Sequence, residues 1–171
     1  MKYLKFLLII GLITSTVACK KNRYPEFENS ANAQFTRTAA TGTTAAPYNN
    51  GTLSKAAPAT TDEFLLKVVE SGNVKSVAVM VDYRKSTAPN TTVYTQQFAT
   101  ITSWPQTYNA SLNSLVTLFA SNGLTVGGLA VGDRFVFRIV ITLNSGTVIS
   151  EQAAIMNAAP YAITLTYTVA A

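Results

Sequence analysis

Alternation of hydrophobic and polar residues runs through most of the chain after residue 60 and predicts β-strands. The clearest case is 134–143, where every second residue from Phe135 to Leu143 is large and apolar, and Arg138 and Thr142 lie between them. A period of two places the apolar side chains on one face of a strand. Similar segments predict further strands at 33–38, 63–69, 74–83, 92–102, 147–152 and 161–169.

Turn-forming residues between these segments predict two β-hairpins. Ser71-Gly72-Asn73 separates 63–69 from 74–83, and Asn144-Ser145-Gly146 follows 134–143. Short loops of this composition between alternating segments are typical of hairpins. We therefore expect each of these strands to pair with the strand that follows it in the chain.

One segment, Asn109–Ser121, has the period of a helix instead. Its apolar residues recur at intervals of three and four, which places them on one helical face. Asn122-Gly123 follows as a left-handed stop signal. The apolar face consists of Leu112, Leu115, Val116, Phe119 and Ala120. We expect one short helix over an end or an edge of the sheets.

About seven short strands with one helix favour an all-β fold, a two-sheet antiparallel sandwich over residues 35–171. Residues near 39–61 are mostly Thr, Ala, Gly, Pro and Asn. Such a segment buries too little apolar surface to offset the entropy lost on ordering it. We expect an edge strand near 33–38 and a mobile loop after it.

Residues 1–18 have the layout of a secretory signal peptide. Met1–Lys5 is cationic, Phe6–Ile13 is apolar, and Thr14–Ala18 consists mainly of small residues. The apolar run is too short for a permanent helix across about 30 Å of hydrocarbon. The sequence therefore predicts removal of this segment during secretion.

Cys19, the only cysteine, follows the small residues Val17 and Ala18. This pattern resembles the lipobox of bacterial lipoproteins, in which cleavage before the cysteine is accompanied by acylation of that cysteine. Several acyl chains on one residue give stable membrane anchoring. We expect a lipidated Cys19 with a polar tether over 19–34, and Lys20 in place of Asp favours the outer membrane, with the periplasmic or surface leaflet left open.

Charge is concentrated at the N-terminus. The chain has 13 basic and 8 acidic residues, and Lys2, Lys5, Lys20, Lys21 and Arg23 all precede the first acid. The remaining eight basic residues are therefore balanced by eight acidic ones. A nucleic-acid partner needs a concentration of Lys and Arg on one face, so this partner class is not expected.

Catalysis and metal binding have little support in the composition. The chain has no histidine, which excludes a Ser-His-Asp triad, a Cys-His dyad and His-containing zinc sites. Asp82 and Asp133 are candidate acids, but nothing predicts the paired carboxylates that a glycosidase needs. We interpret Asp133 as a turn residue and Asp82 as a solvated strand residue, and expect no enzyme activity, metal or cofactor.

Three aromatic residues are the candidate ligand contacts: Trp104, Tyr94 and Tyr108. Aromatic rings form platforms on which sugars stack, although a sandwich core also buries such side chains. For Arg138, on the polar face of its strand, we expect either an ion pair with Glu63 or Asp82 or a stem that covers apolar surface.

Several short motifs are distributed over the chain: Cys19-Lys20-Lys21, the segment 24–31, the strand 74–83, Gly132–Arg138 and Ala159-Pro160-Tyr161. Together they resemble a family of Bacteroidetes outer-membrane lipoproteins found beside starch-utilisation-type transporters. The resemblance implies an immunoglobulin- or fibronectin-like sandwich. It also implies an accessory or glycan-associated role, with a polysaccharide or an outer-membrane transporter complex as partner.

Together these features predict a lipid-anchored, non-enzymatic binding or accessory protein of the outer membrane. The alternative is a structural or adhesive protein, similar to fimbrial subunits, in which the terminal strand at 161–169 pairs with another chain. The position of that strand in its sheet distinguishes the two hypotheses, because only an edge strand is available for such pairing.

Overall fold

The computed structural model describes residues 31–38, 49–69, 73–87, 92–150 and 163–171. The predicted signal peptide, Cys19 and the tether up to residue 30 lie outside the described residues, as do 39–48 of the predicted mobile loop.

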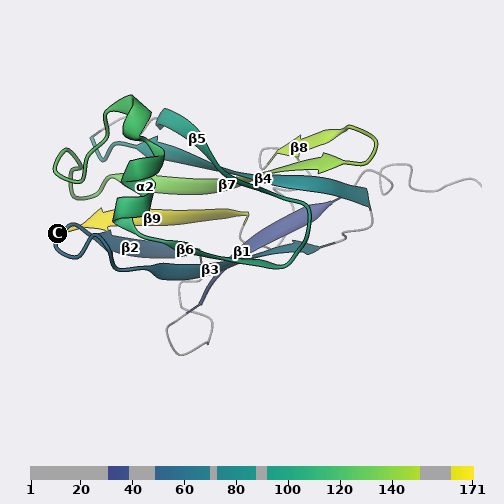
Figure 1. The fold of residues 1–171 in the computed structure, drawn as a ribbon, viewed down its shortest axis with the longest axis horizontal. Coiled ribbons are helices and arrows are strands. Elements are labelled where there is room, and N and C mark those ends of the chain that lie inside the picture. The colour runs from purple at the N-terminus through teal and green to yellow at the C-terminus, as the bar shows by residue number, and fades with distance from the viewer. Residues whose placement is uncertain (1–30, 39–48, 70–72, 88–91, 151–162) are drawn as a thin grey trace, which may run out of the picture.

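Two β-sheets packed against each other make up the described part of the chain (Figure 1). The smaller sheet has the order β1 (Asn32–Thr38), β3 (Asp62–Val69), β6 (Gln106–Ala110). The larger sheet has the order β2 (Asn50–Ser54), β9 (Thr164–Ala170), β7 (Arg134–Leu143), β4 (Val74–Arg84), β5 (Thr92–Ile101), and β8 (Val148–Ser150) also pairs with β7. The prediction of an all-β two-sheet sandwich is confirmed.

Among the described strands, pairing is antiparallel with one exception. β2 runs parallel to β9, with Leu53 opposite Val169. β2 lies inside the segment that we expected to be a mobile loop, so that prediction is wrong for 50–54. Leu53 is 4% exposed and belongs to the core, and pairing with β9 satisfies the backbone of a segment whose composition alone does not favour a strand.

The predicted faces of the long strands are confirmed. In β7, Phe135, Phe137, Ile139, Ile141 and Leu143 are all buried. The same holds for alternate residues of β4 and β9, which are Val77, Val79, Val81, Tyr83, Leu165, Tyr167 and Val169. Because these alternate side chains all point to one side, the larger sheet has an inner face that forms the core and an outer face that points away from it.

Aromatic rings fill the space between the sheets. The ring of Phe137 lies 5.1 Å from Phe64 and 5.2 Å from Phe98, measured between centroids, and 5.8 Å from Tyr167. All three contacts are edge-on, the geometry that the charge distribution of aromatic rings favours. Phe35 of β1 adds edge-on contacts to Phe64 and Phe137, so these rings join both sheets in one core.

The one α-helix among the described residues, α2 (Leu112–Leu118), is shorter than expected. Ser111 caps it, because its side chain accepts a hydrogen bond from the backbone N–H of Ser114. The 3₁₀ turn η4 (Ala120–Asn122) follows, and Gly123 ends it in the left-handed conformation, as the sequence predicts. The expected start at Asn109 is wrong because Asn109 belongs to β6, where it pairs with Glu63.

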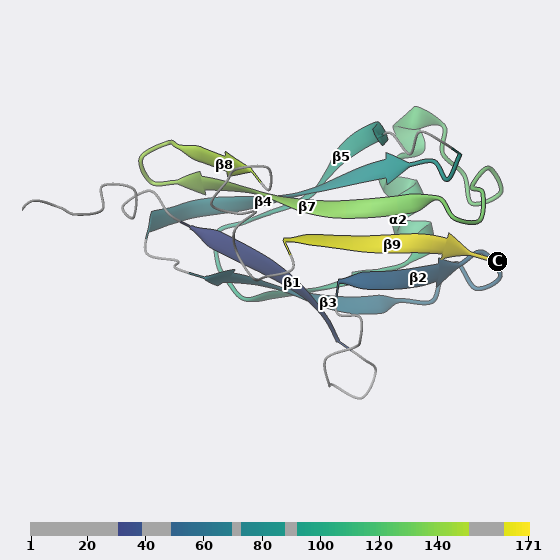
Figure 2. The same cartoon turned by 180° about the vertical axis from the view of Figure 1, so that it is seen from behind.

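The helix crosses one end of the larger sheet on the inner side (Figures 1 and 2). Its buried residues Leu112 and Leu115, together with Phe119, close that end of the core. Phe119 contacts Tyr83 and Phe135, with ring centroids 6.4 and 6.0 Å apart. The expected position of the helix over an end of the sheets is therefore confirmed.

One of the two predicted hairpins is wrong. β3 pairs with β1 and β6 in the smaller sheet, whereas β4 pairs with β5 and β7 in the larger sheet. The chain thus changes sheets between the two strands. The second hairpin, β7 with β8, is confirmed, and Gly146 in its turn has a φ of 87°, a conformation that glycine adopts without strain.

Candidate functional site

The outer face of the larger sheet holds a cluster of charged side chains. In Figure 2 the larger sheet is seen with α2 behind it, and β4, β7 and β9 lie side by side. Asp82 and Arg84 of β4 and Arg134 and Arg138 of β7 occupy outward positions, because they alternate with buried residues. We call Arg84, Arg134 and Arg138 the arginine cluster.

Asp82 lies at the centre of this cluster and is 4% exposed. Its Oδ1 accepts hydrogen bonds from Arg138 Nε at 3.1 Å and from Thr95 Oγ1 at 2.7 Å, and its Oδ2 accepts one from Arg84 Nη2 at 3.2 Å. The expectation of a solvated Asp82 is therefore wrong, because neighbouring side chains on three strands cover it. Of the alternatives that we left open for Arg138, the structure has the ion pair with Asp82.

Asp82 carries a negative charge at neutral pH. Burial raises the pKa of its carboxyl group, but the hydrogen bonds from Thr95, Arg138 and Arg84 outweigh burial and hold the pKa below its ordinary value. Three guanidinium groups therefore face one carboxylate, which leaves an excess of two positive charges on this part of the face.

Arg84 and Arg134 lie directly opposite each other on β4 and β7. Like charges in this position destabilise a sheet. Within the described part of the chain, no ion pair offsets the charge of Arg134. The Nε of Arg84 is buried and has no hydrogen-bond partner there either. This pair is the least satisfied polar feature of the outer face.

Threonine hydroxyl groups lie on the outer face on both sides of the arginine cluster. Arg84 and Arg134 belong to a row of cross-strand neighbours that continues through Thr168 of β9 to Thr52 of β2. The neighbouring rows contain Thr95, Thr164 and Thr166 at outward positions of β5 and β9. Such a surface can bind an anion through guanidinium groups and hydrogen-bond neutral hydroxyls beside it.

Asp133 has a structural role in the turn before β7, as expected. Its Oδ2 accepts hydrogen bonds from Tyr83 Oη at 2.6 Å and from the backbone N–H of Ala130 at 2.9 Å. Its Oδ1 accepts one from the backbone N–H of Ser86 at 2.8 Å. Burial raises the pKa of Asp133, but these donors outweigh burial and keep it below its ordinary value. Burial and the adjacent carboxylate raise the pKa of Tyr83.

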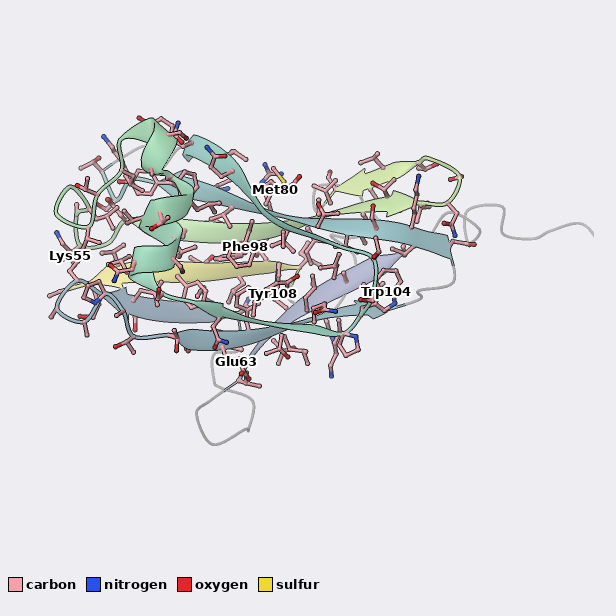
Figure 3. The ribbon with its side chains drawn as sticks, in the orientation of Figure 1. Lys55, Glu63, Met80, Phe98, Trp104 and Tyr108 are labelled. Atoms are coloured by element: carbon pink, nitrogen blue, oxygen red, sulfur yellow. The ribbon has the colours of Figure 1, made fainter. Side chains whose placement is uncertain are left out.

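The three candidate aromatic residues do not form one platform. Tyr108 packs on Phe98 with 5.4 Å between ring centroids, and Figure 3 shows these two side chains together, with Trp104 apart from them, just before β6 begins at Gln106. Tyr94 instead stacks on Tyr83, with 6.3 Å between ring centroids, near the other end of β5. Ile101 lies seven positions after Tyr94 along β5, a distance of roughly 20 Å.

All three of these aromatic side chains are partly buried against the core. The separation of Tyr94 from Trp104 agrees with the predicted strand at 92–102, because that strand carries Tyr94 near its start and Trp104 follows its end. Contact of these rings with a ligand stays a prediction.

A pocket of about 240 Å³ lies between β2 and the start of β3. It is lined by Thr52, Leu53, Ser54, Ala57, Thr60, Thr61 and Asp62. The one acidic residue of this pocket, Asp62, forms hydrogen bonds within the protein. Arg37 donates two hydrogen bonds to its carboxylate, at 2.6 and 2.8 Å, and Tyr167 Oη donates a third at 2.7 Å. The two bonds from Arg37 lie within the smaller sheet, and the bond from Tyr167 of β9 joins the two sheets, so we interpret Asp62 as structural.

The sequence did not single out Arg84 and Arg134 as site residues. Each occupies a polar position in an alternating strand, and this pattern does indicate that its side chain points away from the core. Their proximity depends on the register of β4 against β7, and strand register is not visible in a single sequence.

Comparison with known protein families finds no family model that matches the chain, and none of the curated protein sequences matches it either. Among the described residues, no group of three or more Cys, Asp and Glu side chains is placed to hold a metal ion. None of the helices formed by those residues has the length and apolar character that a membrane crossing requires.

Proposed function

We propose that this protein is a lipid-anchored, non-enzymatic binding or accessory protein of the outer membrane, and that it captures glycans on the outer face of its larger sheet. The N-terminal sequence supports the anchor, because a signal-peptide pattern ends at Cys19. A tethered binding domain serves such a role, since it holds a ligand close to the membrane.

The observation that carries the proposal is the composition of the outer face. Guanidinium groups and threonine hydroxyls lie in adjacent rows across four paired strands. A rigid sheet holds these groups at fixed spacing, so that binding a polysaccharide orders few protein side chains. The two candidate acids, Asp82 and Asp133, are occupied by hydrogen bonds within the fold, which supports a non-enzymatic role.

The proposal includes an immunoglobulin-like topology. We take β1, β3 and β6 as strands A, B and E, and β9, β7, β4 and β5 as G, F, C and C′. The order of these strands in the two sheets supports a variable-type arrangement, and β2 and β8 have no letter in this assignment. No counterpart of strand D is found in the described part of the chain. This assignment supports a binding domain, since sandwiches of this type present whole sheet faces and end loops to ligands.

Glycan binding is tested directly with the full-length protein in detergent on a polysaccharide array, followed by isothermal titration calorimetry of each hit. We expect saturable binding to at least one polysaccharide, unchanged in Trp104→Ala if the outer face is the site. Absence of binding to every polysaccharide would contradict the glycan function. Loss of binding in a correctly folded Trp104→Ala variant would move the site to the aromatic residues.

The adhesive alternative has one observation in its favour. β1 is an edge strand of the smaller sheet, paired only with β3 among the described strands. The strand that this alternative pairs with another chain, β9, lies between β2 and β7 and is paired on both sides, so its donation would break the larger sheet. Analytical ultracentrifugation tests this alternative, which requires self-association or a partner complex.

A further inference from the structure

The Arg84–Arg134 pair is unfavourable for the fold as it stands. The two side chains are direct cross-strand neighbours of like charge. Asp82 pairs with Arg84 and Arg138, and no described carboxylate forms an ion pair with Arg134. A bound anion at this position would offset the repulsion between the two guanidinium groups.

Asp82 shows which anion this face accommodates. Its planar carboxylate accepts hydrogen bonds from two guanidinium groups and one threonine hydroxyl, at 2.7 to 3.2 Å. Arg84 and Arg134, followed by Thr168 in the same row, offer the same set of donors to a second carboxylate. Guanidinium groups match a carboxylate in shape, because both are planar and can form two parallel hydrogen bonds.

The rest of the face favours a sugar chain as the carrier of that carboxylate. Beside the arginine cluster lie Thr52, Thr166 and Thr168, whose hydroxyls can pair with sugar hydroxyls. None of the described outward positions of β2, β4, β7 and β9 holds an aromatic residue. A neutral glycan would therefore find no ring to stack on, and a protein partner would find little of the aromatic surface that is typical of interface cores.

We propose that the ligand is a uronic-acid polysaccharide, and that Arg84 and Arg134 bind one of its carboxylates while the threonine rows bind the adjacent sugar hydroxyls. This inference rests on the proposed glycan-binding function and narrows it to an acidic polysaccharide. It also assigns Arg134 a role in binding rather than in folding.

The test compares polygalacturonate with its methyl ester, because the two polymers share a backbone and differ in charge. We expect the full-length protein to bind polygalacturonate with an affinity that falls as NaCl is raised, and to bind the ester at least about tenfold more weakly. Equal affinity for both polymers would overturn this inference and leave glycan binding intact. Absence of binding to any polysaccharide would overturn the proposed function itself.

Two variants distinguish binding by Arg134 from a general effect of the protein's net charge. Arg134→Gln should weaken polygalacturonate binding at least about tenfold, while Lys67→Gln, the same charge change at an exposed position of β3, should leave it unchanged. Arg134→Gln should be at least as thermally stable as the parent, because it relieves the repulsion with Arg84. Destabilisation by Arg134→Gln, or equal effects of the two variants, would overturn the assignment.

A lipid surface is the other anionic target that such a face could bind. Vesicles of phosphatidylcholine with and without phosphatidylglycerol provide the comparison. Vesicle binding that depends on phosphatidylglycerol and on Arg134, without binding to polygalacturonate, would overturn the polysaccharide assignment in favour of a membrane headgroup.

Discussion

Replacing Asp133 by Asn removes one negative charge from a nearly inaccessible site and changes the shape of the side chain very little. Asp133 is 2% exposed and accepts three hydrogen bonds, from Tyr83 Oη and from the backbone N–H groups of Ala130 and Ser86. An amide has one acceptor oxygen. If that oxygen keeps the bonds from Tyr83 and Ala130, the amide NH₂ group faces the N–H of Ser86 and that bond is lost.

The expected cost at pH 7 is about 3 kcal/mol in the free energy of unfolding. A hydrogen bond to a charged group contributes about 1.5–3 kcal/mol and a neutral one about 0.5–1.5 kcal/mol. The substitution loses one hydrogen bond to a charged group and converts two others into hydrogen bonds to a neutral group. The summed loss of free energy is reduced because Ala130 and Ser86 are exposed residues whose N–H groups can hydrogen-bond to water.

The cost should depend on pH in a defined direction. Because the pKa of Asp133 is lowered in the folded state, its contribution is fully present above the unfolded-state pKa of about 3.9 and decreases as the pH falls toward the folded-state value. The deficit of Asp133→Asn relative to the parent should therefore be constant above about pH 5 and shrink below about pH 4.

Urea denaturation at several pH values measures this deficit, with the fluorescence of Trp104, the only tryptophan, as the signal. Glu63→Gln, at an exposed position of β3, is the control and should stay within about 0.5 kcal/mol of the parent. A deficit below about 1 kcal/mol at pH 7, or one that persists unchanged at pH 3, would refute the role assigned to the carboxylate.

Three further changes test other parts of the structure. Gly51→Ala should destabilise the protein by about 1–3 kcal/mol in urea denaturation, because the new Cβ would lie 2.6 Å from the buried ring of Tyr167; a neutral effect would show that this contact is loose. Leu115→Ala should cost about 2–5 kcal/mol, since it leaves a cavity beneath the helix, whereas Asn113→Ala at an exposed position of the helix should cost far less. Cys19→Ala should release the protein from the membrane fraction, and mass spectrometry of the parent should find acyl groups on Cys19; an unmodified Cys19 would contradict the anchor.

The sequence alone predicted the properties that depend on neighbours along the chain. The alternation in 134–143 predicted both the bounds of β7 and its buried face, because each side chain of a strand points opposite to the next. Gly123 and Gly146 were predicted as turn positions for the same local reason, since each adopts a positive φ. The two-sheet architecture followed from the number and spacing of such strands.

Tertiary structure decided everything that depends on which strands meet. A turn sequence at 71–73 predicted a hairpin, yet β3 and β4 lie in different sheets. Leu53 lies in a segment that is too polar to predict a strand, and this segment forms the strand β2 because it pairs with β9. The register of β4 against β7 likewise buries Asp82 between arginines and sets Arg84 opposite Arg134. Pairing joins residues far apart in the chain, and its energy depends on packing and hydrogen bonds that no local pattern contains.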